Sequence, residues 1–251
     1  MDKFIHTVLN SVQNLYDNRS VQAQNLANLS VPGYRKDISV KPTASVFLDL
    51  DGSLASRAFS VREDRNQFSD EQGSVDRTDS ELDVAIRGIG YMYGSAGGDP
   101  FLTRRGDLAL DSNGMLINGA GEKILDTDLQ PINVPPARKI TINGEGQIII
   151  TPLGAEDGVE QQVAVLGLTS AAGAKLKKSD DGSVRQIDGG LPVPDQQVTL
   201  VQGFIELANV NVVDELVNQI ENQRHYEINI KMISTGKDLD EAGSSLLRMP
   251  S

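Results

Sequence analysis

The sequence predicts an α+β fold: long N- and C-terminal helices pair as a coiled-coil-like domain, with a central all-β domain and an extended connector between them. Three observations predict it. Apolar residues recur at steps of three and four at both ends, which is the pattern of one helix face. Short β-branched runs separated by turn residues fill the middle. A charged stretch with few large apolar side chains precedes these runs.

The first helix is predicted over residues 1–29, which contain no glycine and no proline. At 1.5 Å per residue it is about 40 Å long. It stops at Ser30-Val31-Pro32-Gly33, because proline pushes the preceding residue out of the α region. One narrow stripe runs along this helix and includes two polar positions: Ile5, Val8, Val12, Leu15, Arg19, Gln22, Leu26 and Leu29.

Residues 31–82 are predicted to form the extended connector, which is most highly charged around Arg62-Glu63-Asp64-Arg65. Residues 83–204 are predicted to form a β-rich outer domain, either a sandwich or a partly open barrel. Its strand-like runs are residues 84–86, 141–142, 147–150, 162–166 and 197–201. The turn signals between them are residues 112–114, 119–121, 143–146, 152–154 and 180–182.

The second helix begins at a capping box formed by Asn211 and Asp214, with Glu215 in the first turn. We expect it to end at about residues 231–234 and to fray or bend at Gly236, before the tail 249–251. Residues 1–30 and 205–251 then form the helical axial-core domain. The stripe of this helix is Leu216, Ile220, Gln223, Tyr226, Ile230 and Ile233.

Composition excludes several classes of function. The chain has 23 basic and 35 acidic side chains, a net charge of −12, which argues against binding nucleic acid or an anionic membrane surface. Cysteine is absent, so disulfides, thiolate metal sites and a cysteine nucleophile are excluded. No stretch approaches the roughly 20 apolar residues that span a bilayer, so membrane insertion is not expected. The N-terminus does not resemble a cleavable secretory signal, so any export uses a route without a cleaved leader.

The candidate chemical motifs favour structural interpretations. Gly88-Ile89-Gly90 resembles the start of a dinucleotide loop, but no helix N-terminus follows it. The segment 111–114 resembles part of a calcium loop, but alanines occupy two ligand positions, so we expect a hairpin turn. His6 and His225 have no second ligand at metal spacing. No nucleophile elbow occurs. We therefore expect no enzyme, catalytic residue, cofactor, metal or small-molecule substrate. A soluble β-fold binding module or hydrolase is the alternative.

The stability of the terminal helices is compatible with two arrangements. Burying the aliphatic side chains of the first stripe stabilises the chain by about 10–15 kcal/mol. Ordering the helix backbone costs about 1–2 kcal/mol per residue, and the helical hydrogen bonds return about 0.5–1.5 kcal/mol each. Pairing the two stripes alone therefore leaves a free energy near zero. The helices either form a self-contained hairpin docked on the β domain or gain their stability between subunits. In the second case, Gln22 and Gln223 set the register.

Three separated blocks of the sequence resemble the family of flagellar rod and hook proteins. At the N-terminus these are Gln24-Asn25-Leu26-Ala27-Asn28 and Gly33-Tyr34-Arg35-Lys36. Residues 82–91 and 103–111, with Gly114, resemble the entry to the β domain of the family. Residues 208–217 and 223–229 are similar to its C-terminal signature. The start and the length are most similar to proximal-rod members, with distal-rod members as the alternative.

The resemblance implies a structural subunit of the bacterial flagellar rod, exported by the type III apparatus. Such subunits assemble into a helical tube that crosses the periplasm and transmits torque from motor to hook. It implies other rod subunits, proximal and distal, and copies of the chain itself as partners. Asn25 and Asn28 would cap carbonyls across a subunit boundary, and Arg224 would bind carbonyls or acids of a neighbour. The expected subunit-interface residues are Leu15, Asn25, Leu26, Asn28, Leu216, Ile220, Arg224, Tyr226 and Asn229.

Overall fold

The computed structural model describes residues 2–38, 44–48, 57–61, 67–154, 156, 158–179 and 182–247. The chain forms two compact units. Unit 1 contains residues 1–27, 37–65 and 211–251, and unit 2 contains residues 28–36 and 66–210. The charged segment 62–65, the tail 249–251 and residues 180–181 of a predicted turn lie outside the described residues, as do the side chains of Ile5 and His6.

Unit 1 contains both helices. α1 (Asp2–Ala27) ends just before the predicted stop, which confirms the N-terminal helix. α2 (Val212–Leu247) begins at the predicted cap, where Asn211 Oδ1 accepts hydrogen bonds from the backbone N–H of Val213 at 3.0 Å and Asp214 at 3.5 Å. Within the segment expected to be a connector, β1 (Ala44–Leu48) and β2 (Arg57–Val61) pair as an antiparallel hairpin.

The expected end of the second helix near residues 231–234 is wrong. α2 continues through Gly236 to Leu247. A glycine costs a helix interior only about 1 kcal/mol. The residues after it are mostly good helix formers, and Lys237 and Glu241 form an i,i+4 ion pair with an Nζ–Oε1 distance of 3.6 Å. A single glycine therefore does not end this helix.

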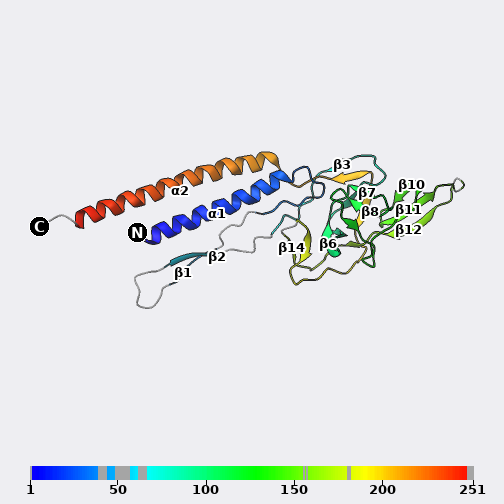
Figure 1. The fold of residues 1–251 in the computed structure, drawn as a ribbon, viewed down its shortest axis with the longest axis horizontal. Coiled ribbons are helices and arrows are strands. Elements are labelled where there is room, and N and C mark those ends of the chain that lie inside the picture. The colour runs from blue at the N-terminus through cyan, green and yellow to red at the C-terminus, as the bar shows by residue number, and fades with distance from the viewer. Residues whose placement is uncertain are drawn as a thin grey trace. The chain divides into compact units, whose positions relative to one another are not determined.

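The coiled-coil-like pairing expected of the terminal helices is also wrong. The two helices lie side by side and antiparallel, with both termini of the chain at the same end of the pair (Figure 1). A coiled coil buries its apolar stripe in the seam between the helices. Here Leu216, Ile220, Tyr226 and Ile230 of the expected stripe are all exposed. The α+β class with a central β domain is confirmed, but its helices are not joined by an apolar seam.

Unit 2 is the β-rich unit (Figure 1). Its largest sheet has the strand order β14-β15-β6-β5-β9-β8-β7, with β13 paired to β5, and a second sheet has the order β10-β11-β12. The larger sheet contains β5 (Tyr91–Ala96), β6 (Asp99–Thr103), β7 (Leu108–Leu110), β8 (Leu116–Asn118), β9 (Lys123–Ile124), β13 (Leu168–Thr169), β14 (Leu176–Lys178) and β15 (Val184–Gln186). The second contains β10 (Ala137–Ile142), β11 (Gln147–Pro152) and β12 (Gln161–Val165).

Two further strand pairs join the beginning of unit 2 to its end. β3 (Val75–Arg77) pairs antiparallel with β17 (Phe204–Glu206), and β4 (Val84–Arg87) pairs antiparallel with β16 (Thr199–Gln202). The chain therefore enters and leaves this unit along neighbouring strands. The strand-like runs predicted at residues 84–86, 141–142, 147–150, 162–166 and 197–201 all lie on or overlap strands.

Four turns of unit 2 share one design. In each, a side-chain oxygen accepts hydrogen bonds from the backbone N–H groups two and four residues further on, and the fourth residue has a positive φ. At Asp111 both distances are 2.8 Å, and the hydrogen bond from Met115 lowers the pKa of this carboxyl. The calcium-like segment is thus a hairpin turn, as predicted. The four turns begin at Asp111, Asn118, Asp126 and Asn143.

Strand β5 separates two apolar cores. Met92 packs in a large cluster of aliphatic side chains that includes Ile86, Ile148 and Leu200. Its neighbours Tyr91 and Tyr93 pack in a second cluster on the opposite face, because successive side chains of a strand alternate. Gly90, at the start of this strand, has φ +146°, and a Cβ there would collide with Val198. Packing therefore requires glycine at residue 90, and a left-handed φ of +82° favours glycine at residue 88.

Candidate assembly surface

α2 directs a polar line toward α1. Asn229, which is 8% exposed, donates from Nδ2 to Oγ of Ser11 at 3.0 Å. Asn222, seven residues earlier, lines a groove together with residues of α1. Buried or half-buried residues recur every seven positions on each helix. On α2 they are Glu215, Asn222, Asn229 and Gly236, and on α1 they are Ser11, Asn18 and Asn25. A line of mostly polar residues therefore runs along the side of α2 that faces α1.

Most large apolar side chains of α2 are exposed. Ile220 is 63% exposed and Leu239 is 56% exposed. At 3.6 residues per turn, the exposed apolar positions cover more than half of the helix circumference. They are Val212, Val213, Leu216, Val217, Ile220, Tyr226, Ile228, Ile230, Met232 and Leu239. Exposed apolar side chains in this number on one helix are typical of a protein–protein interaction site.

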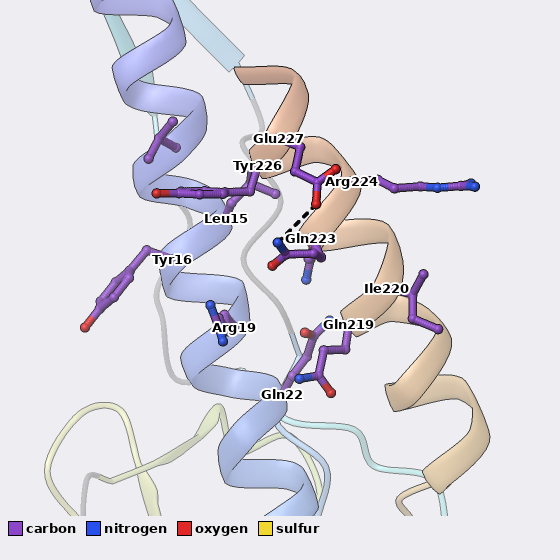
Figure 2. Close-up of a pocket in the computed structure, with 12 residues that line it drawn as sticks. Leu15, Tyr16, Arg19, Gln22, Gln219, Ile220, Gln223, Arg224, Tyr226 and Glu227 are labelled. Carbon is purple, nitrogen blue, oxygen red and sulfur yellow. Dashed lines mark hydrogen bonds between the residues drawn. The ribbon is translucent and has the colours of Figure 1, made fainter. Parts of the chain in front are cut away.

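A groove of about 620 Å³ lies between the two helices beside the polar line. Figure 2 shows the ring of Tyr226 lying across Leu15, and Gln22 beside Gln219. Gln223 donates from Nε2 to Oε1 of Glu227 at 3.3 Å, an i,i+4 contact along α2. Tyr16, Ile220 and Arg224 extend away from the facing helix (Figure 2). The groove is thus lined by apolar, amide and charged side chains.

In α1, the buried acceptors Oδ1 of Asn18 and Oε1 of Gln22 have no hydrogen-bond partner among the described residues. An unsatisfied buried polar atom costs about 1–3 kcal/mol. The contact between α1 and α2 is therefore weaker than an apolar contact of the same size. We therefore expect the helix pair to be the less stable part of the molecule.

The expected interface residues fall into three groups. Leu216, Ile220, Arg224 and Tyr226 are exposed on α2. Leu15, Leu26 and Asn28 are half-buried. Asn25 and Asn229 are buried and bind within unit 1: Asn25 donates from Nδ2 to the carbonyl of Asp37 at 3.0 Å and accepts the N–H of Asp37 at 2.8 Å through Oδ1. In this structure their amides cap groups of their own chain.

A buried charge cluster in unit 2 contains residues that the sequence reading did not single out. Glu206 forms ion pairs with Arg104 at 2.5 Å and with Arg35 at 3.4 Å, and all three side chains are almost fully buried. Burial, and then the charge of Arg104, lower the pKa of Arg35. Arg35 stands in the N-terminal signature and Glu206 just before the C-terminal one. Arg104 also lies in a matching block, 103–111, so the position of these residues in or beside the blocks was the available signal.

Within the described ranges, no group of three histidine, aspartate or glutamate side chains could hold a metal ion. Neither α1 nor α2, as far as the structure describes them, is long and apolar enough to cross a membrane.

Comparison with known proteins gives consistent matches along the chain. The family described as the flagellar hook protein FlgE/F/G D1 domain matches residues 85–150, and the family described as the flagellar basal body rod FlgEFG protein C-terminal matches residues 201–246. The chain is 29% identical to the flagellar basal-body rod protein FlgF of Salmonella typhimurium, over 99% of this chain and 100% of that protein. It is 31% identical to the flagellar basal-body rod protein FlgG of Buchnera aphidicola, over 91% of this chain and 94% of that protein.

Proposed function

The chain belongs to the family of flagellar basal-body rod proteins, as a structural subunit of the rod, and we propose that its terminal helices are the surface through which it assembles. It is similar over most of its length to both FlgF and FlgG members, and its place is the basal-body rod. The matched C-terminal family covers the first 35 residues of α2, residues 212–246, so the assembly surface falls within a region that defines the family.

The observation that carries the proposal is the inverted arrangement of α2. Its polar line faces α1, and most of its large apolar side chains are exposed. Exposed apolar side chains on several sides of a helix need apolar neighbours on those sides. One partner helix cannot supply them, whereas the helices of several neighbouring subunits can. A contact surface that does not close on itself generates a filament, which suits a rod.

The partners that fit this surface are other rod subunits, proximal and distal, and further copies of the chain. Leu15, Leu216, Ile220 and Tyr226 then supply apolar contact area at the axis of the tube. Arg224 extends from the pair (Figure 2) and can bind carbonyls or carboxylates of a neighbour. The other expected interface residues lie behind this surface and stabilise the helix pair and the end of α1. They are Asn25, Leu26, Asn28 and Asn229.

The tube formed in this way crosses the periplasm and passes torque from motor to hook. Many helices packed in parallel share a torsional load across subunits, so no single contact has to be strong. No step of this function requires catalysis, and we assign the chain no enzymatic activity. A soluble β-fold binding module or hydrolase is not favoured, because the similarity to rod proteins extends over nearly the whole chain.

A pair of variants tests the surface. Ile220→Asp places a charge where the apolar side chain is 63% exposed, and Asn218→Asp places the same charge at another exposed position of α2. We expect Ile220→Asp to reduce incorporation into basal bodies at least tenfold and Asn218→Asp to leave it unchanged. Circular dichroism of the isolated proteins checks that unit 2 is folded in both. Normal incorporation of Ile220→Asp would contradict the proposal.

A further inference from the structure

Three stretches of unit 2 that are distant in the sequence meet at one place, the junction: residues 33–36, 69–73 and 204–209. The first follows α1 in the sequence and the last precedes α2. The backbone carbonyl of Glu206 accepts the N–H of Gly33 at 2.8 Å, and its Oε1 accepts the N–H of Gly73 at 3.2 Å. One residue therefore contacts both other stretches.

Asn209 makes a second set of contacts across the junction. Its Oδ1 accepts the N–H of Lys36 at 2.5 Å, and its Nδ2 donates to the carbonyls of Glu71 at 2.7 Å and Ser69 at 3.3 Å. Its own N–H donates to the carbonyl of Tyr34 at 3.2 Å. These partners are more than 130 residues away in the sequence. One amide thus ties the stretch after α1 to the stretch before α2.

Buried charges surround these contacts. The carboxylate of Glu206, with 1% of its side chain exposed, is held by Arg104, which also donates to the carbonyl of Gly90 at 2.6 Å. Lys178 donates to the carbonyl of Arg35 at 2.9 Å, and its Nζ lies 3.6 Å from the ring centre of Tyr34. Buried charges are costly unless paired. Their pairing here therefore depends on all these segments being in place together.

We propose that Asn209 and Glu206 are positioning residues that hold the stretches leading to α1 and α2 as one rigid body, so that a twist applied to one stretch is carried by the other. This inference rests on the proposed function, because it assigns the junction a role in passing torque. Its physical basis is the long range of the hydrogen bonds. A local contact stabilises one turn, whereas Asn209 links stretches that the backbone alone leaves independent.

Asn143 provides a matched control for Asn209. It is also half-buried, and its amide makes three hydrogen bonds. All three join it to Glu145 or Gln147, within four residues in the sequence. Asn143→Ala and Asn209→Ala remove the same chemical group and a similar number of hydrogen bonds. A merely structural role predicts similar effects of the two variants outside their own sites, whereas the positioning role predicts that only Asn209→Ala loosens the junction.

Amide hydrogen exchange on the full chain tests the first step. We expect Asn209→Ala to speed exchange at Lys36 and Ser69 at least tenfold, because Lys36 loses its acceptor and the N–H of Ser69 bonds to the carbonyl of Lys36 at 2.8 Å. Asn143→Ala should leave both amides unchanged. Unchanged exchange at Lys36 and Ser69 in Asn209→Ala would overturn the proposal. Glu206→Gln, which keeps the shape but not the charge, serves if Asn209→Ala does not fold.

Rotation of flagella in cells that carry the chain as their only copy of this subunit tests the second step. We expect Asn209→Ala to be incorporated into rods but to lose at least half of its rotation speed under high viscous load, while Asn143→Ala rotates normally. A disulfide between Lys36→Cys and Ser69→Cys, in a chain without other cysteines, should restore rotation. Equal rotation of the two asparagine variants, or no rescue, would overturn the proposal. Absence of the unaltered chain from rods would instead refute the proposed function.

Discussion

Arg104 and Arg77 each pair with a carboxylate, but in opposite surroundings. The side chain of Arg104 is 1% exposed at its contact with Glu206, whereas Arg77 and Asp79 are both 70% exposed. Removing one partner of a buried pair leaves an uncompensated charge and costs about 3–5 kcal/mol. Exposed pairs contribute about 0–1 kcal/mol. We expect Arg104→Met to lower the free energy of unfolding of unit 2 by several kcal/mol and Arg77→Met to leave it almost unchanged in denaturant titrations. Equal losses would contradict the assignment of the buried pair.

Tyr91 makes the stability of unit 2 sensitive to alkaline pH. Burial, and then the charge of Asp70, raise its pKa to about 12 from the ordinary value of 10. The stabilisation is complete below pH 10 and is lost as the pH rises to about 12, because only the unfolded chain ionises in that range. The loss is about 2–3 kcal/mol.

The pH dependence is measured by denaturant titration at several pH values between 9 and 12. Tyr91→Phe should flatten the fall, since phenylalanine has no proton to lose. Tyr16→Phe, on a ring that is 75% exposed, should leave the fall as it is. A fall of the same size in Tyr91→Phe would mean that another group is responsible.

The four side-chain-capped turns were partly predictable because their chemistry is local. Asx residues followed by glycine are turn signals, and the turns at residues 112–114 and 143–146 were predicted on that basis. The turn that begins at Asp126 was not, because Leu129 occupies its fourth position at φ +59° where the other three have glycine. Leu129 packs against the second core cluster, so tertiary contact overrides the local preference.

The glycines of two of these turns have nearly the same φ but different surroundings. Gly121 and Gly146 have φ +81° and +82°, but a Cβ at Gly121 meets open space, whereas one at Gly146 lies 3.1 Å from Leu168 and 3.2 Å from Leu166. The left-handed conformation alone costs an alanine about 1–2 kcal/mol. We expect Gly121→Ala to lose that amount and Gly146→Ala to lose at least 1 kcal/mol more, measured by thermal unfolding. A larger loss at Gly121 would contradict the packing argument.

The helices show what a sequence pattern leaves undecided. Spacing of three and four located both helices and the start of α2, since capping and periodicity are local properties. It did not decide which face of α2 meets α1, because a polar seven-residue line and an apolar stripe coexist on this helix. Asn229 and Asn25 were named as interface residues from the resemblance. Only tertiary geometry places their amides on Ser11 and Asp37. Glu206 and Asn209 were missed because their partners lie far away in the sequence.

The two units are stabilised by different kinds of side-chain contact. In unit 2, both described core clusters are built from residues 68–200, and they consist of aliphatic and aromatic side chains. In unit 1, the contact between the helices has a polar line with unsatisfied acceptors. Buried apolar area is the main source of stability. The helix surface can therefore adjust its contacts to neighbouring subunits, while the apolar core of unit 2 keeps its structure.

This difference predicts two separate unfolding transitions in the isolated chain, with the helix pair melting first. A chain of residues 28–210 lacks both helices and retains every residue of the two core clusters. In scanning calorimetry it should lose the lower transition and keep the upper one within a few degrees. The same chain should fail to enter basal bodies, because it lacks the outward-facing apolar residues of α2. If its upper transition disappeared, unit 2 would depend on the helices for its own folding, and the separation of assembly surface from folded core would be wrong.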